Sequence, residues 1–258
     1  MTTLGIPSWP HCGHGAPPGG AGCRGRSVEP YTACLAHLSD DDRSAYLAGL
    51  QPGAHLDHRG TLFTEELLSE LLASLKDPST DRPCLGDARF DEAKIGGSAW
   101  FEGAEIGVGA SFRRGRFVGT AAVGPLVCTG TLDLSEAVFE SAVTIEAATA
   151  VLHCRRTRWA STGALRLRHA AVDLSDAVLE YPVSMSAHSR PFALLSREMA
   201  EPGLTDPRVR ALSLRGGDAA HPAMYAFEKT STRRCGPLPA RPPMREDFSF
   251  SQMSTAGQ

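Results

Sequence analysis

The stretch ARFDEAKIGGSAWFEGAEIGVGASFRRGRF, residues 88–117, decides the fold of this protein. A small residue, any residue and a large apolar residue recur in it at short intervals. The large residues follow one another at steps of five, six, five, six and five: Phe90, Ile95, Phe101, Ile106, Phe112 and Phe117. Neither the 3.6-residue period of a helix nor the simple alternation of a strand produces this spacing. Self-similarity at a short step is typical of repeat proteins.

Farther along the chain, apolar residues recur every 20 residues. The segment LDLSEAVF at 132–139 returns as VDLSDAVL at 172–179. Four apolar series share this spacing: Leu132, Leu152, Val172, Phe192 and Leu212; Leu134, Cys154, Leu174, Leu194 and Leu214; Phe139, Trp159, Leu179 and Met199; and Ile145, Leu165 and Met185.

Both regularities predict a coil in which four sides of five residues make one turn. One small and one large residue of each side point inward, and successive turns stack about 4.8 Å apart through backbone hydrogen bonds. A single turn cannot bury its own apolar face, whereas a stack of turns can. Residues 85–217 allow about six turns, which predicts a rod about 30 Å long.

These repeats resemble those of the pentapeptide-repeat proteins, a family with bacterial members. The match covers about half of the chain and is most specific in residues 88–117, while Pro182, Pro191, Pro202 and Pro207 interrupt the later repeats. The resemblance implies a mainly β fold, a right-handed quadrilateral β-helix, with short N-terminal helices that cap one end.

Two short helices are expected before the coil. Ser39 precedes three aspartates and Thr64 precedes two glutamates, which is typical of helix N-termini. Leucines at 67, 68, 71, 72 and 75 form the apolar stripe of the second helix. Residues 56–63 have the character of an earlier, degenerate piece of the coil, which we expect the second helix to cover.

We therefore divide the chain into four parts: a Gly/Pro-rich Cys/His segment (1–38), a helical cap (39–80), the β-helix (81–217) and a tail expected to be disordered (218–258).

The formal net charge is −3 over 258 residues. Such a balance argues against nucleic-acid binding and against a strongly acidic mimic of DNA. The chain has neither a signal-peptide pattern nor an apolar run long enough to span a membrane. Seven cysteines without a signal peptide predict reduced thiols in the cytoplasm.

The N-terminal cysteines are the best candidate for a site. Cys34 and His37 form a C-x2-H pair, and Cys12 and Cys23 precede them. Three thiolates and one imidazole suit a tetrahedral structural zinc ion, whose binding would help a glycine-rich segment to fold. His14 is an alternative ligand, and an unstructured segment with reduced thiols is the alternative to a metal site.

The sequence otherwise predicts a binding role and no enzyme. It holds neither a nucleophile motif nor a phosphate-binding motif that could form an active site. Arg116, Glu136, Arg156 and Asp176 are 20 residues apart and alternate in sign, which predicts a self-neutralised column on the coil. We expect a non-enzymatic protein-interaction or scaffold module whose protein partner is unknown. The alternative, implied by some members of the family, is a DNA-mimicking inhibitor of DNA gyrase; another open interpretation is a truncated relative of longer, membrane-linked proteins.

Overall fold

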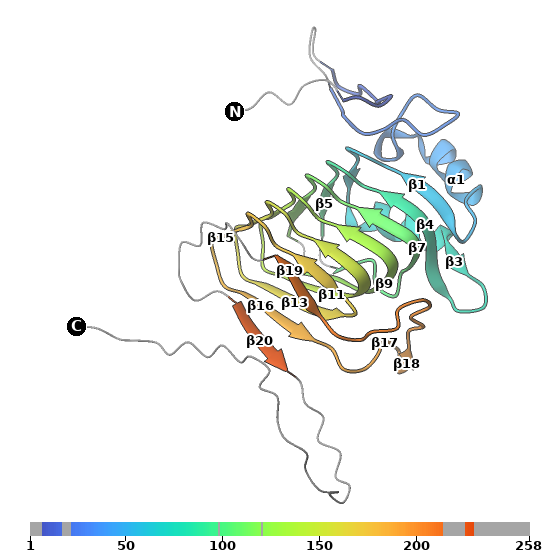
Figure 1. The fold of residues 1–258 in the computed structure, drawn as a ribbon. Coiled ribbons are helices and arrows are strands. Elements are labelled where there is room, and N and C mark those ends of the chain that lie inside the picture. Colours follow the sequence, from blue (N-terminus) through green and yellow to red (C-terminus); the bar gives the residue numbers. More distant parts are fainter. Residues whose placement is uncertain (1–6, 17–21, 98, 120, 214–224, 230–258) are drawn as a thin grey trace, which may run out of the picture.

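The computed structural model describes residues 7–16, 22–97, 99–119, 121–213 and 225–229. Short parallel strands stack as a β-solenoid of about five turns, with two short α-helices near the N-terminal end (Figure 1). The prediction of a mainly β chain coiled as a β-helix with short N-terminal helices is confirmed.

Within these described residues the strands form three sheets. The twelve strands of the largest sheet are β1 (Ala54–Asp57), β3 (Lys76–Asp77), β4 (Arg82–Arg89), β6 (Ala99–Trp100), β7 (Glu105–Ser111), β9 (Ala122–Asp133), β11 (Val143–His153), β13 (Gly163–Arg168), β14 (Ala171–Asp173), β16 (Val183–Ala187), β19 (Arg210–Ser213) and β20 (Tyr225–Lys229). The second sheet contains β2 (Leu62–Phe63), β5 (Lys94–Gly96), β8 (Arg116–Val118), β10 (Val138–Phe139), β12 (Arg158–Trp159) and β15 (Val178–Leu179). The third is an antiparallel pair, β17 (Ala193–Leu194) and β18 (Arg197–Glu198).

Register along the second sheet shows how the turns stack. Its inward residues succeed one another as Phe63, Ile95, Phe117, Phe139, Trp159 and Leu179. The turns from Ile95 to Phe139 contain 22 residues, because two sides of each turn have six residues rather than five. The turns from Phe139 to Leu179 contain 20 residues. The steps of five and six near residue 100 and the later 20-residue period therefore belong to one continuous coil.

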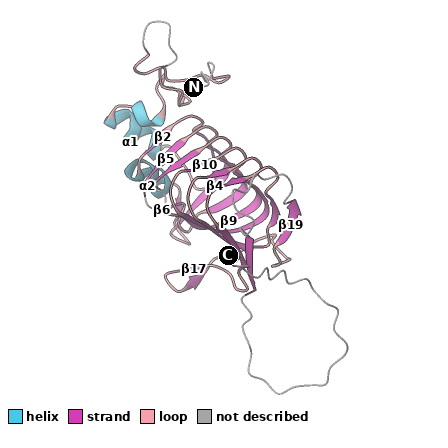
Figure 2. Ribbon diagram, turned by 90° about the vertical axis from the view of Figure 1, so that its left-hand side faces the viewer, coloured by secondary structure: helices cyan, strands magenta, loops and turns pink. Residues whose placement is uncertain are grey.

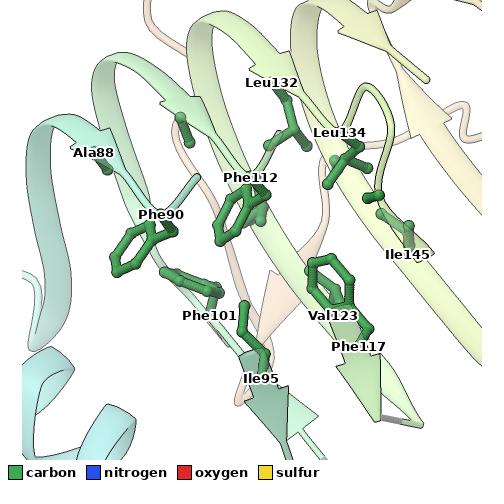
Figure 3. Close-up of a cluster of buried hydrophobic side chains, with 14 of the residues drawn as sticks. Ala88, Phe90, Ile95, Phe101, Phe112, Phe117, Val123, Leu132, Leu134 and Ile145 are labelled. Atoms are coloured by element: carbon green, nitrogen blue, oxygen red, sulfur yellow. The ribbon is translucent and has the colours of Figure 1, made fainter. Parts of the chain in front are cut away.

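Aromatic rings fill the interior of the first turns. Phe90 and Phe112 stack with ring centroids 5.2 Å apart, and both lie inside the coil (Figure 3). In the next column the ring centroid of Phe139 lies 4.8 Å from that of Phe117 and 4.2 Å from that of Trp159. Offset stacking at these distances adds to the free energy gained by removing the rings from water.

The helical cap closes the N-terminal end of the coil. Ser39 and Thr64 accept hydrogen bonds from Asp42 N and Leu67 N, so they begin α1 (Asp40–Ala48) and α2 (Glu65–Ser74) as predicted. Helix α2 buries Leu67, Leu68, Leu71 and Leu72 against the coil, and it lies beside β2 at that end (Figure 2). The predicted early piece of the coil is confirmed, since β1 and β2 pair in parallel with β4 and β5.

A buried histidine lies beneath this cap. His58 is fully buried between the rings of Tyr46 and Phe63, and its Nε2 is 3.3 Å from the Tyr46 hydroxyl. Burial lowers the pKa of His58 to about 4, and nearby Asp57 offsets only part of this effect. The folded chain therefore holds a neutral imidazole here.

The free energy of unfolding is expected to fall on acidification because of His58. The pKa of this histidine is lower in the folded chain than its ordinary value near 6.5, so the unfolded chain binds the extra proton. The stabilising contribution is complete above pH 6.5 and is lost as the pH falls towards 4, by up to about 3 kcal/mol. Urea unfolding of wild type and His58→Phe across this range measures it. The variant should show a flatter pH dependence, and parallel curves would contradict the assignment.

One excursion interrupts the coil. Val172 pairs with Ala211 of β19, so residues 188–207, here called the strap, lie outside the stack. Phe192, Leu194 and Met199 lie in the strap and therefore do not continue the predicted columns, so those three expectations are wrong. Phe192 and Met199 pack on Val127 and Ala148 at the flank of the coil. The excursion also explains why the solenoid has about five turns where the sequence predicts six. Leu212 belongs to β19 and Leu214 lies outside the described residues.

A buried ionic cluster holds the strap in place. The Glu201 carboxylate lies 2.7 Å from Arg168 Nε and 2.8 Å from His169 Nε2, and all three side chains are nearly inaccessible to solvent. At the β17–β18 hairpin in the middle of the strap, Arg82 donates to the carbonyl oxygens of Arg197 and Glu198. Three of the prolines that interrupt the repeats, Pro191, Pro202 and Pro207, thus lie in a segment with its own anchoring contacts, whereas the carbonyl of Pro182 accepts a hydrogen bond from Gly163 within the coil.

The predicted tail contains one strand. Tyr225–Lys229 forms β20, which pairs with β16, although the sequence predicts disorder from residue 218 onward. The other residues of that predicted tail lie outside the described part of the chain. Among the helices of the described part, none is long and apolar enough to cross a membrane.

Candidate metal centre

The glycine-rich segment before the cap folds back on itself. The amides of Cys12 and Gly13 donate to the carbonyl oxygens of Gly25 and Cys23, and the amide of Cys23 donates to His14. These bonds bring Cys12 and Cys23 side by side. Cys34 precedes the short 3-10 helix Leu35–His37, and residues three apart in such a helix face the same side. His37 therefore lies on the same side as Cys34.

Four ligand atoms meet between these elements. The sulfurs of Cys12, Cys23 and Cys34 and the ring nitrogen of His37 all lie within 4.8 Å of one another. Nδ1 of His37 is 3.6 Å from the Cys12 sulfur and 3.4 Å from the Cys34 sulfur, and the Cys23 and Cys34 sulfurs are 3.7 Å apart. The four residues predicted as ligands thus form a cluster that could hold a metal ion.

The size of the cluster can be compared with that of a zinc site. Bond lengths of about 2.3 Å to sulfur and about 2.0–2.1 Å to nitrogen place the atoms of a tetrahedron about 3.5–3.8 Å apart. The distances of 3.4, 3.6 and 3.7 Å given above nearly equal these edges, and the other pairs of ligand atoms lie within 4.8 Å of each other. The arrangement needs little movement to accept a tetrahedral ion.

Electrostatics in the cluster also favour a cation. Burial raises the pKa of the Cys34 thiol, and the neighbouring Cys23 and Cys12 raise it further. Burial lowers the pKa of His37, and the adjacent His14 contributes to this shift, which keeps the imidazole neutral and able to bind a metal. A divalent cation would stabilise the thiolates that are costly in its absence.

His14, the alternative ligand predicted from the sequence, lies beside His37. Its ring stacks on that of His37, with centroids 4.2 Å apart, and it lies outside the four-residue cluster. It supports the orientation of the His37 ring. The contacts therefore favour His37 over His14 as the nitrogen ligand.

The cluster is anchored to the coil by contacts that sequence patterns did not reveal. Arg24, beside Cys23, forms a 2.6 Å ion pair with Glu92, which lies between β4 and β5 of the coil. The Trp9 indole donates to the carbonyl of Arg24, and the Arg59 guanidinium lies 4.8 Å above the Trp9 ring. Because these partners are 15 to 68 residues apart, only the folded chain brings them together.

Gly25 provides a test that leaves every ligand in place. A Cβ at this position would lie 2.8 Å from both Cβ and Sγ of Cys34. We expect Gly25→Ala to displace Cys34 and to weaken zinc binding at least about tenfold, measured by competition with a chromogenic chelator. Gly96→Ala is the control, because its Cβ would meet only ordinary contacts at 3.8 Å. Equal zinc affinity in the two variants would contradict this geometry.

The charged column predicted on the coil exists with one correction. The register places Arg114, not Arg116, between Glu92 and Glu136. The prediction used a 20-residue turn, whereas this turn contains 22 residues. Arg114 bridges Glu92 at 3.7 Å and Glu136 at 3.0 Å, and Arg156 continues the column at 2.8 Å from Glu136.

Two surface clefts lie apart from the cysteine cluster. One, of about 560 Å³, lies between α2, the β3–β4 hairpin and the strap, with Leu72, Phe101 and Leu194 among its lining residues. The other, of about 510 Å³, lies over Gly109 and Gly130. Within the described residues, one group has metal-binding geometry: Cys12, Cys23, Cys34 and His37.

Comparison with family models, curated proteins and solved structures gave no match.

Proposed function

We propose that this chain is a pentapeptide-repeat protein that acts as a non-enzymatic interaction scaffold, with a structural zinc ion at its N-terminal end. The observation that carries the proposal is the continuous register from Phe63 to Leu179, which holds outward side chains at fixed steps of about 4.8 Å. A surface ordered in this way suits recognition of a protein partner.

The proposed zinc ion has a structural role. Three cysteines and one histidine supply four protein ligands, which leaves no coordination position for a substrate. The ion would join residues 12–37, and the Arg24–Glu92 ion pair would connect them to the coil. Reduced thiols are required, so the proposal places the chain in a reducing compartment, the cytoplasm.

The alternative is a DNA-mimicking inhibitor of gyrase, as in some members of the family that the repeats resemble. A mimic of DNA needs a continuous negative face. Here the outward carboxylates of Glu92, Glu136 and Glu140 each pair with an arginine. This pairing supports the scaffold over the mimic.

The test is capture of partners by the folded full chain from cells of its source, followed by direct binding between purified components. The scaffold proposal expects a specific protein to bind in both steps. A gyrase supercoiling assay is run in parallel. Potent inhibition of supercoiling, or the absence of any direct protein partner, would overturn the proposal.

A further inference from the structure

Two arginine clusters lie on the same corner of the coil, two turns apart. The chain has Arg113-Arg114-Gly115-Arg116 and, 42 residues later, Arg155-Arg156-Thr157-Arg158. Val138 pairs with Arg116 on one side and with Arg158 on the other. Glu136 likewise bridges Arg114 and Arg156. The corner therefore carries two equivalent clusters separated by about 10 Å.

Opposite charges at this corner lie at different depths. The six arginine side chains are between 50% and 64% exposed. Their carboxylate partners are between 4% and 36% exposed: Glu92, Asp133, Glu136, Glu140, Asp173 and Glu180. The charges nearly balance in number, and the exposed Asp176 follows Arg156 in its column. The outer layer of the corner is nevertheless rich in guanidinium groups.

The ion pairs use only part of each guanidinium. Arg114, Arg155 and Arg158 donate to carboxylates through Nε, and Arg156 donates through one terminal nitrogen. Arg116 donates through Nε and one terminal nitrogen to a single oxygen of Glu140. Arg113 makes only longer contacts, 3.9 Å to Asp133 and 3.7 Å to Glu136. A guanidinium has five N–H donors, and its planar shape suits a second, incoming carboxylate. The carboxylates below fix the arginines in position, which lowers the entropic cost of binding an anion.

From this layering we infer that the arginine corner, residues 113–116 and 155–158, binds an acidic segment of a partner protein in extended conformation. An extended chain of the polyproline II type has three residues per turn and rises about 3.1 Å per residue, so carboxylates three residues apart lie on the same side and about 9 Å apart, close to the separation of the two clusters. The near-zero net charge of the corner disfavours a polyanion such as nucleic acid, whose affinity depends on many uncompensated positive charges. This inference rests on the proposed scaffold function and names the chemistry of its partner.

The test uses two synthetic twelve-residue peptides with the same composition. One has glutamate at every third position, and the other has its glutamates in one consecutive block. Fluorescence anisotropy should show tighter binding of the spaced peptide, weakened by added salt. Arg116→Gln/Arg158→Gln should weaken that binding roughly tenfold, since each residue contributes one charge-assisted contact.

A second double variant should change the affinity for the spaced peptide in the opposite direction. Glu140→Gln/Glu180→Gln frees the same two guanidiniums from their partners and should strengthen binding. Loss of fold would weaken binding in both double variants, and circular dichroism checks it directly. Arg166→Gln, in β13, is the control that should leave affinity unchanged.

Three results would overturn the inference: no binding of either peptide, equal binding by wild type and Arg116→Gln/Arg158→Gln, or displacement of the peptide by a lower concentration of single-stranded DNA. Failure of this inference can be distinguished from failure of the scaffold proposal. If a captured protein partner binds wild type and Arg116→Gln/Arg158→Gln equally well, the scaffold function stands and the arginine corner is not its binding site.

Discussion

Purified chain in which Cys34 is replaced by serine is expected to lose its zinc, whereas wild type should carry about one ion per chain. Cys34 is the fully buried ligand of the cluster, and serine is a poor ligand for zinc. Structural zinc sites contribute about 10–16 kcal/mol of binding free energy in small peptides, so the loss should unfold the segment around the ion. Elemental analysis and hydrogen exchange measure the two effects.

The exchange pattern tests the structural role in detail. Amides of Cys12, Gly13 and Cys23 are hydrogen-bonded within the segment and should exchange faster in Cys34→Ser or after chelation. Amides in the strands from Arg116 to Leu179 should keep their protection, because the coil has its own core. Cys84→Ser is the matched control, since Cys84 lies outside the cluster. Wild type purified without metal under reducing conditions, and unable to take up zinc, would end the hypothesis.

Trp159→Ala should be the most damaging single change within the coil. The Trp159 side chain is fully buried, stacks on Phe139 at 4.2 Å and donates its indole N–H to Thr157. Truncation of a buried tryptophan costs about 3–5 kcal/mol, because it leaves a cavity as well as losing contacts. Thermal and urea unfolding should show this loss, with a decrease in melting temperature of about 10 °C.

Two comparisons separate packing from other causes of this loss. Trp159→Phe keeps a ring in the column and should lose much less stability than Trp159→Ala. Tyr181→Ala removes an aromatic ring that is 51% exposed and should change stability by less than about 0.5 kcal/mol. A cost for Trp159→Ala no larger than that for Tyr181→Ala would contradict the stacked column.

Much of the coil could be predicted because its cause is local and repeated. Each small-x-large unit fixes one side of a turn, and a constant period places Phe139, Trp159 and Leu179 above one another. The same reasoning failed where the period changed. Arg114 replaced Arg116 in the charged column because one turn has 22 residues, and Phe192 left its column because the strap lengthens the chain between stacked strands.

The sequence by itself determined the repeat, the helix starts at Ser39 and Thr64, and the four residues that form the cysteine cluster. These depend on composition and short spacings, which act before the chain folds. Only the tertiary structure decided the distances within the cluster, the Arg24–Glu92 anchor and the different depths of arginines and carboxylates. Such features depend on which turn lies next to which. A change of two residues in the length of a turn, or one excursion from the coil, alters them while the local pattern of apolar residues stays the same.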